Sequence, residues 1–230
     1  MAVTIPSRLF VLEGVMPTIT ALEVQKRNKR RINLYLDDAF AFGLAMNAAV
    51  ALRVDQLLSA SDVETLQAAD DLERAYERAL RFLSYRPRSE EEIRHNLQKH
   101  KVADVVIATA LERLRAAKYV NDTEFATLWV DNRAEHRPRG RRALRYELRQ
   151  KGISDAIIEA SLDEVDELAA ARTVAWKKVG RFAALPQREF RQKMYGLLAR
   201  RGFDSETIRT VIQELIEEHD LTDSEFENED

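Results

Sequence analysis

The spacing of apolar and polar residues changes once along the chain, near residue 46. Before that point the two kinds alternate in the segments ITALEVQK and RINLYLDD, and the segment AFAFGLA follows. Alternation with a period of two is typical of half-buried strands, and the polar stretches KRNKR and Asp37–Asp38 favour turns. The pattern predicts a small hairpin or meander of two or three strands over residues 18–46.

Helical spacing begins directly after the strands. The segment NAAVALRVDQLL, residues 47–58, places four apolar residues on one face of a helix: Val50, Val54, Leu57 and Leu58. Ser61 and Glu64 form an S-x-x-E capping box that would open the next helix. We therefore expect connecting helices over residues 47–69, and helical structure from there to about His219.

The helical part repeats with a period of about 50 residues. When Val102, Ile153 and Phe203 are taken as equivalent anchors, apolar residues occupy the same five further offsets in all three copies. These positions are Ile93, Leu97, Ile107, Leu111 and Leu114 in the first copy, Leu144, Leu148, Ile158, Leu162 and Val165 in the second, and Met194, Leu198, Ile208, Ile212 and Leu215 in the third. A fixed period of this length is the signature of a repeat architecture.

Each copy is broken once, at HKVAD, KGISD or RGFDS. Gly152 and Gly202 directly precede their anchors, as expected of a residue that ends a helix in the left-handed conformation. Lys101 takes this place in the first copy, so its turn should be less relaxed. The candidate caps of the following helices are Asp104, Ser154 and Asp204.

A further helix precedes the break in each copy. Its apolar residues are Leu72, Tyr76, Leu80 and Leu83, then Phe125, Leu128 and Trp129, then Val174, Val179 and Phe182. A three-helix unit this small has little core of its own, so neighbouring units should stabilise one another. We expect a mainly α fold with three tandem three-helix repeats in an elongated array after the small β meander. The expected divisions are 1–17 (undefined), 18–46, 47–69, 70–120, 121–167, 168–219 and a disordered acidic tail, 220–230.

Composition narrows the class of protein. Charged residues make up 33% of the chain, Gly (7) and Pro (5) are scarce, and Cys is absent. The lack of Cys excludes disulfides, thiolate zinc sites and cysteine nucleophiles. No apolar run approaches the ~18 residues of a membrane span, and Glu13 interrupts the short apolar N-terminal piece. We expect a cytoplasmic protein with no membrane contact.

The net charge of −3 hides an asymmetry. The last 17 residues hold nine Asp or Glu and no Lys or Arg, so the first 213 residues carry about +6. Residues 133–151 alone contain eight Lys or Arg against two Glu. The acidic tail is expected to be a solubilising segment, and the alternative hypothesis is that it competes with an anionic ligand such as DNA for a basic face.

The basic runs supply the candidate binding residues. Arg141, Arg145 and Arg149 recur every four residues on one helix face, away from the expected core. That face either meets an anionic ligand or pairs with acids of neighbouring helices; with only two Glu nearby, we favour the ligand, either DNA phosphates or an acidic protein surface. The candidates for contact with a filament or DNA are Arg137, Arg139, Arg141, Arg142, Arg145, Arg149, Lys151, Arg86 and Arg88, with Lys26, Arg27, Lys29, Arg30 and Arg31 in the hairpin turn, where ordinary turn solubility is the alternative.

Signatures of catalysis are absent from the sequence. Neither a P-loop nor a G-x-G-x-x-G motif occurs, and no two of the four histidines (His95, His100, His136 and His219) are four residues apart. We expect no enzyme activity, cofactor or metal. Trp129 and Trp176 fit the apolar helical pattern better than a base-stacking role, whereas Tyr85 and Tyr146, at the basic stretches, are better stacking candidates.

The detailed motifs resemble one family. A turn of the form L-x-x-K/R-G-apolar follows an Arg-Pro-Arg helix start in LRQKGI and recurs in LARRGF, and the run KYVNDTEFA precedes the second unit. Together with the repeat period, this resembles the bacterial RecX family over about residues 70–219, and the N-terminal strands look like the extension of its longer members. Two departures are Lys101 and the third helix start, LPQRE, which lacks Arg-Pro-Arg.

The resemblance implies a non-enzymatic modulator of the RecA recombinase, in DNA repair, recombination and the SOS response. RecX-like proteins bind in the groove of the RecA–single-stranded-DNA filament and usually inhibit its strand exchange, ATP turnover and co-protease activity. The implied partners are the RecA filament and single-stranded or double-stranded DNA, and we expect a monomer. Two alternatives are a general nucleic-acid-binding helical module and a purely structural adaptor.

Overall fold

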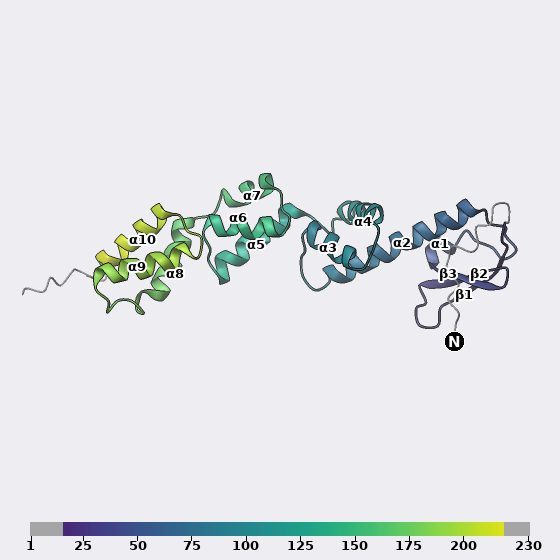
Figure 1. The fold of residues 1–230 in the computed structure, drawn as a ribbon, viewed down its shortest axis with the longest axis horizontal. Helices are drawn as coiled ribbons and strands as arrows, with labels where there is room; N and C mark the ends of the chain where they lie inside the picture. Colours follow the sequence, from purple (N-terminus) through teal and green to yellow (C-terminus); the bar gives the residue numbers. More distant parts are fainter. Residues whose placement is uncertain (1–15, 219–230) are drawn as a thin grey trace, which may run out of the picture. The chain divides into compact units, whose positions relative to one another are not determined.

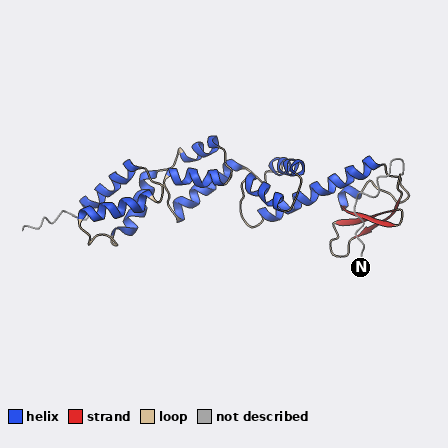
Figure 2. Ribbon diagram, viewed as in Figure 1, coloured by secondary structure: helices blue, strands red, loops and turns tan. Residues whose placement is uncertain are grey.

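The computed structural model describes residues 16–218, which form three strands and ten helices (Figures 1 and 2). Within them the chain divides into two compact units. The first comprises residues 16–86 and 93–120, and the second comprises residues 87–92 and 121–218. The expected undefined segment and acidic tail lie largely or wholly outside the described residues.

The strands form the predicted meander. β1 (Ile19–Val24), β2 (Arg31–Leu36) and β3 (Ala39–Ala45) pair antiparallel in the order β1-β2-β3. Asp37 and Asp38 have φ values of 46° and 65°, the left-handed conformation that a tight hairpin turn requires. One face of the sheet is buried and forms a core with the helix that follows: Ile19, Leu34, Leu36, Leu44, Leu58 and Val63.

The helix predicted over residues 47–58 is wrong. The helix α1 (Met46–Ala49) is a single turn, and Val50 is 81% exposed. The chain beyond it runs alongside the start of β1: the Leu58 amide donates to the Pro17 carbonyl and the Ile19 amide donates to the Gln56 carbonyl. These bonds between distant residues replace the local hydrogen bonds of a helix. The spacing of apolar residues cannot predict them, because they depend on tertiary structure.

Helix α2 (Ala60–Leu83) starts with a capping box, but two residues earlier than predicted. Ser59 accepts from the Asp62 amide at 3.1 Å, and the Asp62 carboxylate accepts from the Ser59 amide at 2.8 Å. The hydrogen bonds from Ser59 lower the pKa of Asp62. The predicted Ser61–Glu64 box is therefore wrong, and the expected boundary at residue 70 falls inside one continuous helix.

The remaining helices follow the 50-residue period. They are α3 (Glu90–Lys99) and α4 (Asp104–Ala116), then α5 (Asp122–His136), α6 (Arg141–Gln150) and α7 (Asp155–Leu162), then α8 (Glu167–Val179), α9 (Gln187–Ala199) and α10 (Ser205–Glu218). The apolar repeat positions are buried except Val102 and Val165, which are partly buried against their own clusters. Leu128 is 54% exposed, so its assignment to the core face is wrong.

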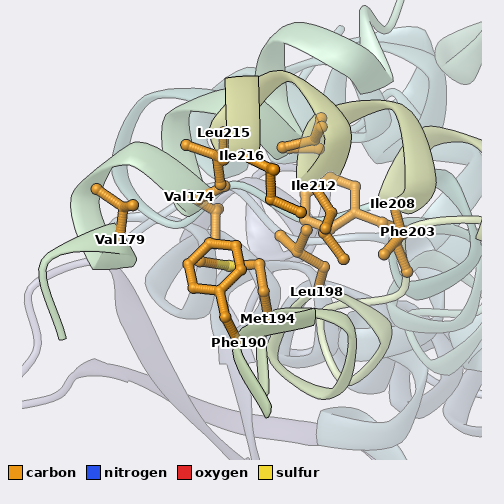
Figure 3. Packing of buried hydrophobic residues seen from close by; sticks show 13 residues of the cluster. Val174, Val179, Phe190, Met194, Leu198, Phe203, Ile208, Ile212, Leu215 and Ile216 are labelled. Carbon is orange, nitrogen blue, oxygen red and sulfur yellow. The ribbon is translucent and has the colours of Figure 1, made fainter. Parts of the chain in front are cut away.

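The third repeat shows how one unit packs. In Figure 3, Phe190, Met194 and Leu198 of α9 point towards apolar side chains of α8 and α10. All three side chains are fully buried. Each repeat has a separate cluster of this kind, which explains why the same apolar offsets recur.

The residues that end the helices at the three breaks have the left-handed backbone conformation that the sequence predicts. Gly152 and Gly202 have φ values of 75° and 86°, and Lys101 adopts the same region at 59°. Only one of the three predicted caps bonds as a cap: Asp204 accepts from the Glu206 and Thr207 amides at 2.8 Å each, and these bonds lower its pKa. Ser154 stands at the N-cap of α7 without a side-chain bond, and Asp104 is already the first residue of α4.

Candidate anion-binding surface

Three arginines follow one face of α6, as predicted, but acids of α7 lie opposite them. Arg145 makes two hydrogen bonds to the Glu159 carboxylate, both of 2.7 Å, and Arg149 Nε donates to Asp155 Oδ1 at 2.8 Å. Arg141 Nη2 donates to the Val165 carbonyl at 2.9 Å. The expectation that this stripe lacks acidic partners is wrong, because the acids follow in the next helix.

The protonation equilibria reflect this pairing. The hydrogen bonds from Arg145 lower the pKa of Glu159, and the same bonds raise the pKa of Arg145. Both groups are therefore held in their charged forms at neutral pH. Arg145 and Arg149 thus form ion pairs with α7, and Arg141 lies 3.9 Å from the Glu167 carboxylate of α8, so the stripe has little net positive charge left to offer a ligand.

The first Arg-Pro-Arg helix start forms a junction with the second repeat. The Ser89 hydroxyl accepts from the Glu92 amide at 3.2 Å and donates to the Lys151 carbonyl at 2.6 Å. Lys151 Nζ lies 2.8 Å from the Glu92 carboxylate, and Arg88 Nη1 lies 3.9 Å from it. Lys151 and Arg88, both predicted to bind DNA or the filament, are thus engaged inside the protein.

The second Arg-Pro-Arg helix start forms the equivalent junction with the third repeat. The Gly140 amide donates to the Arg201 carbonyl at 3.0 Å, and the Arg201 guanidinium donates to the Pro138 carbonyl at 3.4 Å. A Cβ on Gly140 would overlap the Gly202 carbonyl. Burial and the nearby charge of Arg139 lower the pKa of Arg201.

An acid at the start of the next repeat completes each junction. Asp122 Oδ1 accepts from the Glu90 amide at 2.9 Å, and Glu167 Oε1 accepts from the Arg141 amide at 3.2 Å. Burial raises the pKa of Glu167. The donor amides Glu90 and Arg141 lie 51 residues apart, and in each junction an acid from the start of the next repeat accepts from the amide that follows the Arg-Pro-Arg frame.

The two departures from the family pattern fit this arrangement. Helix α9 begins at Gln187, about one turn early by the repeat offset, and the fully buried Phe190 occupies the place of Gly140. The start of α9 therefore does not make the close backbone contact that Gly140 makes with Gly202 at the start of α6. Gly152 and Gly202 are crowded by Glu91 and Ala143 of the preceding repeat, whereas the exposed Lys101 belongs to the first.

A cluster around Trp129 engages further predicted residues. Trp129 Nε1 and Arg133 Nε donate to Glu147 Oε2 at 2.9 and 2.7 Å, and Arg139 Nε lies 3.6 Å from the same carboxylate. The Trp129 ring is partly buried and stacks on Phe125. Trp176 packs likewise against the core of the third repeat, so both tryptophans have structural roles.

Exposed cations remain at the end of α5 and on α6. Arg137 and Arg142 are exposed, and neither forms a side-chain ion pair within residues 16–218. Tyr146 is 66% exposed and lies one turn beyond Arg142. We call Arg137, which follows α5, together with Arg142 and Tyr146 of α6, the outer α6 surface. Because Arg142 and Tyr146 are four residues apart within the helix, the aromatic ring lies beside a guanidinium group.

The hairpin turn of the first unit holds the other exposed cations. Four of them are exposed and form no ion pair in the described part of the chain: Lys26, Arg27, Lys29 and Arg30. The fifth predicted residue, Arg31, donates to Asp70 at 2.8 Å, and Asp70 is only 5% exposed and also accepts from the Ala45 amide. Arg31 therefore ties the sheet to α2. Arg86 and Tyr85 are exposed.

Other kinds of site find no support in residues 16–218. No group of three or more His, Cys, Asp or Glu side chains there could hold a metal ion. None of the helices in that range combines the length and apolarity needed to cross a bilayer. His219 lies outside the described residues.

Comparisons with known proteins agree with this architecture. Sequence models of the first, second and third RecX three-helix domains match residues 75–114, 121–162 and 164–212. A model of the regulatory protein RecX N-terminal domain matches residues 17–56. The N-terminal strands and all three repeats therefore have counterparts in one family.

Whole-chain relatives and solved structures give the same result. The regulatory protein RecX of Bacillus licheniformis is 34% identical over 210 residues, covering 89% of this chain and 80% of the relative. That of Listeria monocytogenes is 31% identical, covering 89% and 78%. A crystal structure of regulatory protein RecX covers 86% of this chain and 100% of its own, with 28% identity and a TM-score of 0.73, and one from Lactobacillus salivarius covers 64% and 97%, with 29% identity and a TM-score of 0.60. The chain belongs to the RecX family of regulatory proteins.

Proposed function

We propose that this chain is a non-enzymatic, cytoplasmic regulator that binds in the groove of the RecA–single-stranded-DNA filament. It inhibits the strand exchange, ATP turnover and co-protease activity of RecA, and so acts in DNA repair, recombination and the SOS response. Membership of a family of regulatory proteins supports this proposal. The observation that carries the contact surface is the outer α6 surface, where an exposed guanidinium group without an ion pair in the described residues lies one turn from an exposed tyrosine.

The rigid setting of this surface favours binding. Arg142 and Tyr146 project from a helix whose opposite side packs through Leu144 and Leu148 and whose start is held by the Gly140 junction. Because the helix backbone is already ordered, only the entropy of the side chains is lost when they meet a phosphate or a carboxylate. DNA phosphates and an acidic protein surface both satisfy such guanidinium groups.

The direct test is a titration of RecA ATPase activity on single-stranded DNA. We expect activity to fall at substoichiometric or near-equal ratios of this protein to RecA. Undiminished activity with the protein in excess would contradict the proposal. The general nucleic-acid-binding alternative instead predicts tight, sequence-tolerant DNA binding without RecA, and loss of ATPase activity only when the DNA itself is sequestered.

The double variant Arg137→Glu, Arg142→Glu tests the outer α6 surface. We expect about tenfold more protein to be needed for half-inhibition, equivalent to ~1.4 kcal/mol, because two attractive contacts become repulsive. The measurement is the same ATPase titration, beside circular dichroism to confirm helix content. Arg53→Glu, Arg78→Glu makes the same charge change at exposed residues of the first unit and should inhibit like the unaltered protein; equal losses in both variants would assign the effect to net charge.

A further inference from the structure

A cavity of about 260 Å³ lies in the first unit, between α2 and the turn that joins α3 to α4. We call it the α2–α4 pocket. The apolar part of its wall comes from Ala75 on α2 and from Val102 and Val106 on the other side. Helix α2 packs on α4 through a buried core that includes Ala75, which holds the two walls in place (Figure 1). The volume is below the ~300 Å³ at which pockets for drug-sized ligands begin, so the pocket suits a compact ligand.

The polar part of the pocket wall is mainly cationic. Arg74 and Arg78 lie one turn apart on α2, and His100 and Lys101 come from the turn between α3 and α4. All four are exposed, and none of them forms an ion pair within residues 16–218. Among the described residues one carboxylate, Asp71, lines the wall, so three permanent positive charges face a single negative one. Like charges one turn apart repel each other, and an anion in the pocket would relieve that repulsion.

The start of α4 adds to the positive character of the pocket. Ala103, which lines the pocket, stands at the N-cap of this 13-residue helix and has no side-chain oxygen that could accept from the first backbone amides. Ser59 and Asn121 supply such an oxygen at the starts of α2 and α5. The Asp104 carboxylate accepts from the Gln98 side chain at 3.2 Å. A negatively charged ligand in the pocket would supply the acceptor that Ala103 lacks.

Lys101 contributes its charge from a backbone position that glycine holds in the other two repeats. Its φ of 59° lies in the left-handed region, as do the values for Gly152 and Gly202. A residue with a Cβ is less stable in this region than glycine. Because the side chain at this position is a cation in the pocket wall, a single substitution can separate anion binding from stability.

We propose that the α2–α4 pocket binds a small phosphate anion, either a pyrophosphate or the terminal phosphate of a small molecule. Arginine donates paired hydrogen bonds to phosphate oxygens, and lysine adds a point charge. A terminal phosphate carries up to about two negative charges, which matches the excess of two positive charges in the wall. A phosphodiester inside a DNA strand carries one charge and continues in both directions, so it suits an open groove better than a small cavity.

This inference goes beyond the proposed function. The pocket lies in the first unit, and none of the residues that the sequence predicts to contact DNA or the filament lines it. Binding of a small anion there requires neither RecA nor DNA.

The test is a calorimetric titration of the full chain with inorganic pyrophosphate at low salt, without RecA or DNA. We expect saturable binding at one site per chain. The double variant Arg74→Gln, Arg78→Gln should raise Kd about tenfold or more, because it removes charge-assisted hydrogen bonds. The matched control Lys29→Gln, Arg53→Gln removes two charges from exposed residues of the same unit outside the pocket, and should bind like the unaltered chain.

Lys101→Gly distinguishes a lost ligand contact from a weakened fold. Glycine suits the left-handed turn, so the unfolding temperature should rise, while Kd for pyrophosphate should increase about fivefold through the loss of one positive charge. A rise in both quantities assigns the weaker binding to the missing ammonium group. An unchanged Kd in both this variant and the arginine variant would overturn the proposal, as would an equal loss in the arginine variant and its control.

Two further titrations identify the source of the phosphate. Adenosine diphosphate presents a diphosphate on a nucleoside, and the tighter of the two ligands shows whether the anion arrives free or attached to a nucleotide. Oligo(dT) without a terminal phosphate, at the same phosphate concentration, should not displace pyrophosphate; displacement would overturn the proposal in favour of a general surface for nucleic-acid backbones. Absence of saturable binding by either small ligand would also overturn it. Because RecA is absent, none of these results depends on the ATPase titration.

Discussion

Replacing Gly140 with alanine should destabilise the second unit by about 2–3 kcal/mol. The backbone of Gly140 is ordinary, with φ of −73° and ψ of 160°, so the cost does not come from its conformation. It comes from the third repeat, whose Gly202 carbonyl and Phe203 amide nitrogen occupy the space that a Cβ would need. The atoms that a Cβ at position 140 would meet belong to the backbone of the third repeat and cannot rotate away as a side chain could. One repeat must therefore move away from the other, which breaks the Gly140–Arg201 hydrogen bond.

Urea unfolding followed by circular dichroism measures this effect, and Gly180→Ala is the matched control. Gly180 has φ of −56°, and no atom lies within 4 Å of the position of its Cβ. Alanine there should leave stability unchanged or raise it by up to ~1 kcal/mol, through the lower entropy of the unfolded chain. Equal stability of the two variants would refute the junction as described.

Reversing all three stripe arginines to glutamate should lower the unfolding temperature by roughly 4 °C or more. In the variant Arg141→Glu, Arg145→Glu, Arg149→Glu, new carboxylates face Asp155 and Glu159 of α7, and the bond to the Val165 carbonyl is lost. Like charges at these distances repel, and added salt should relieve part of the loss. Thermal unfolding at low and high salt measures both effects.

A charge swap distinguishes pairing from a general intolerance of substitution. Adding Asp155→Arg and Glu159→Arg to the triple variant restores opposite charges across α6 and α7 and should recover a substantial part of the lost stability. No recovery would mean that the ion pairs do not link the two helices. The triple variant is also a poor probe of RecA binding, because any loss of inhibition would include the effect of a weakened fold.

The helical repeat could be predicted from sequence because burial follows apolar spacing directly. Ile93, Leu144 and Met194 are apolar at equivalent offsets, and each is buried in the cluster of its own repeat. The left-handed turns at Gly152 and Gly202 were predictable for a similar reason, since their backbone requirement is local. The strands were likewise predictable, because apolar and polar residues alternate along them.

The candidate site was less predictable, because a side chain's partner is a property of the tertiary structure. The sequence places Arg145 and Arg142 in the same basic run, yet Glu159 neutralises Arg145 while Arg142 stays exposed without an ion pair in the described chain. Of the candidate residues in this basic run, only those of the outer α6 surface therefore remain available to a ligand. No local signal in the run separates the two arginines, since the acids follow in a different helix.

The amino-acid sequence by itself determined the periodic features: strand alternation, the 50-residue repeat, the buried offsets and the glycine turns. Only the tertiary structure decided that residues 55–58 bond to the start of β1 and that Gly140 meets Gly202. The physical reason is the distance along the chain over which each kind of interaction acts. Periodicity and backbone preference act within a few residues, whereas ion pairs, close backbone approaches and exposed faces depend on elements that fold against one another from distant parts of the chain.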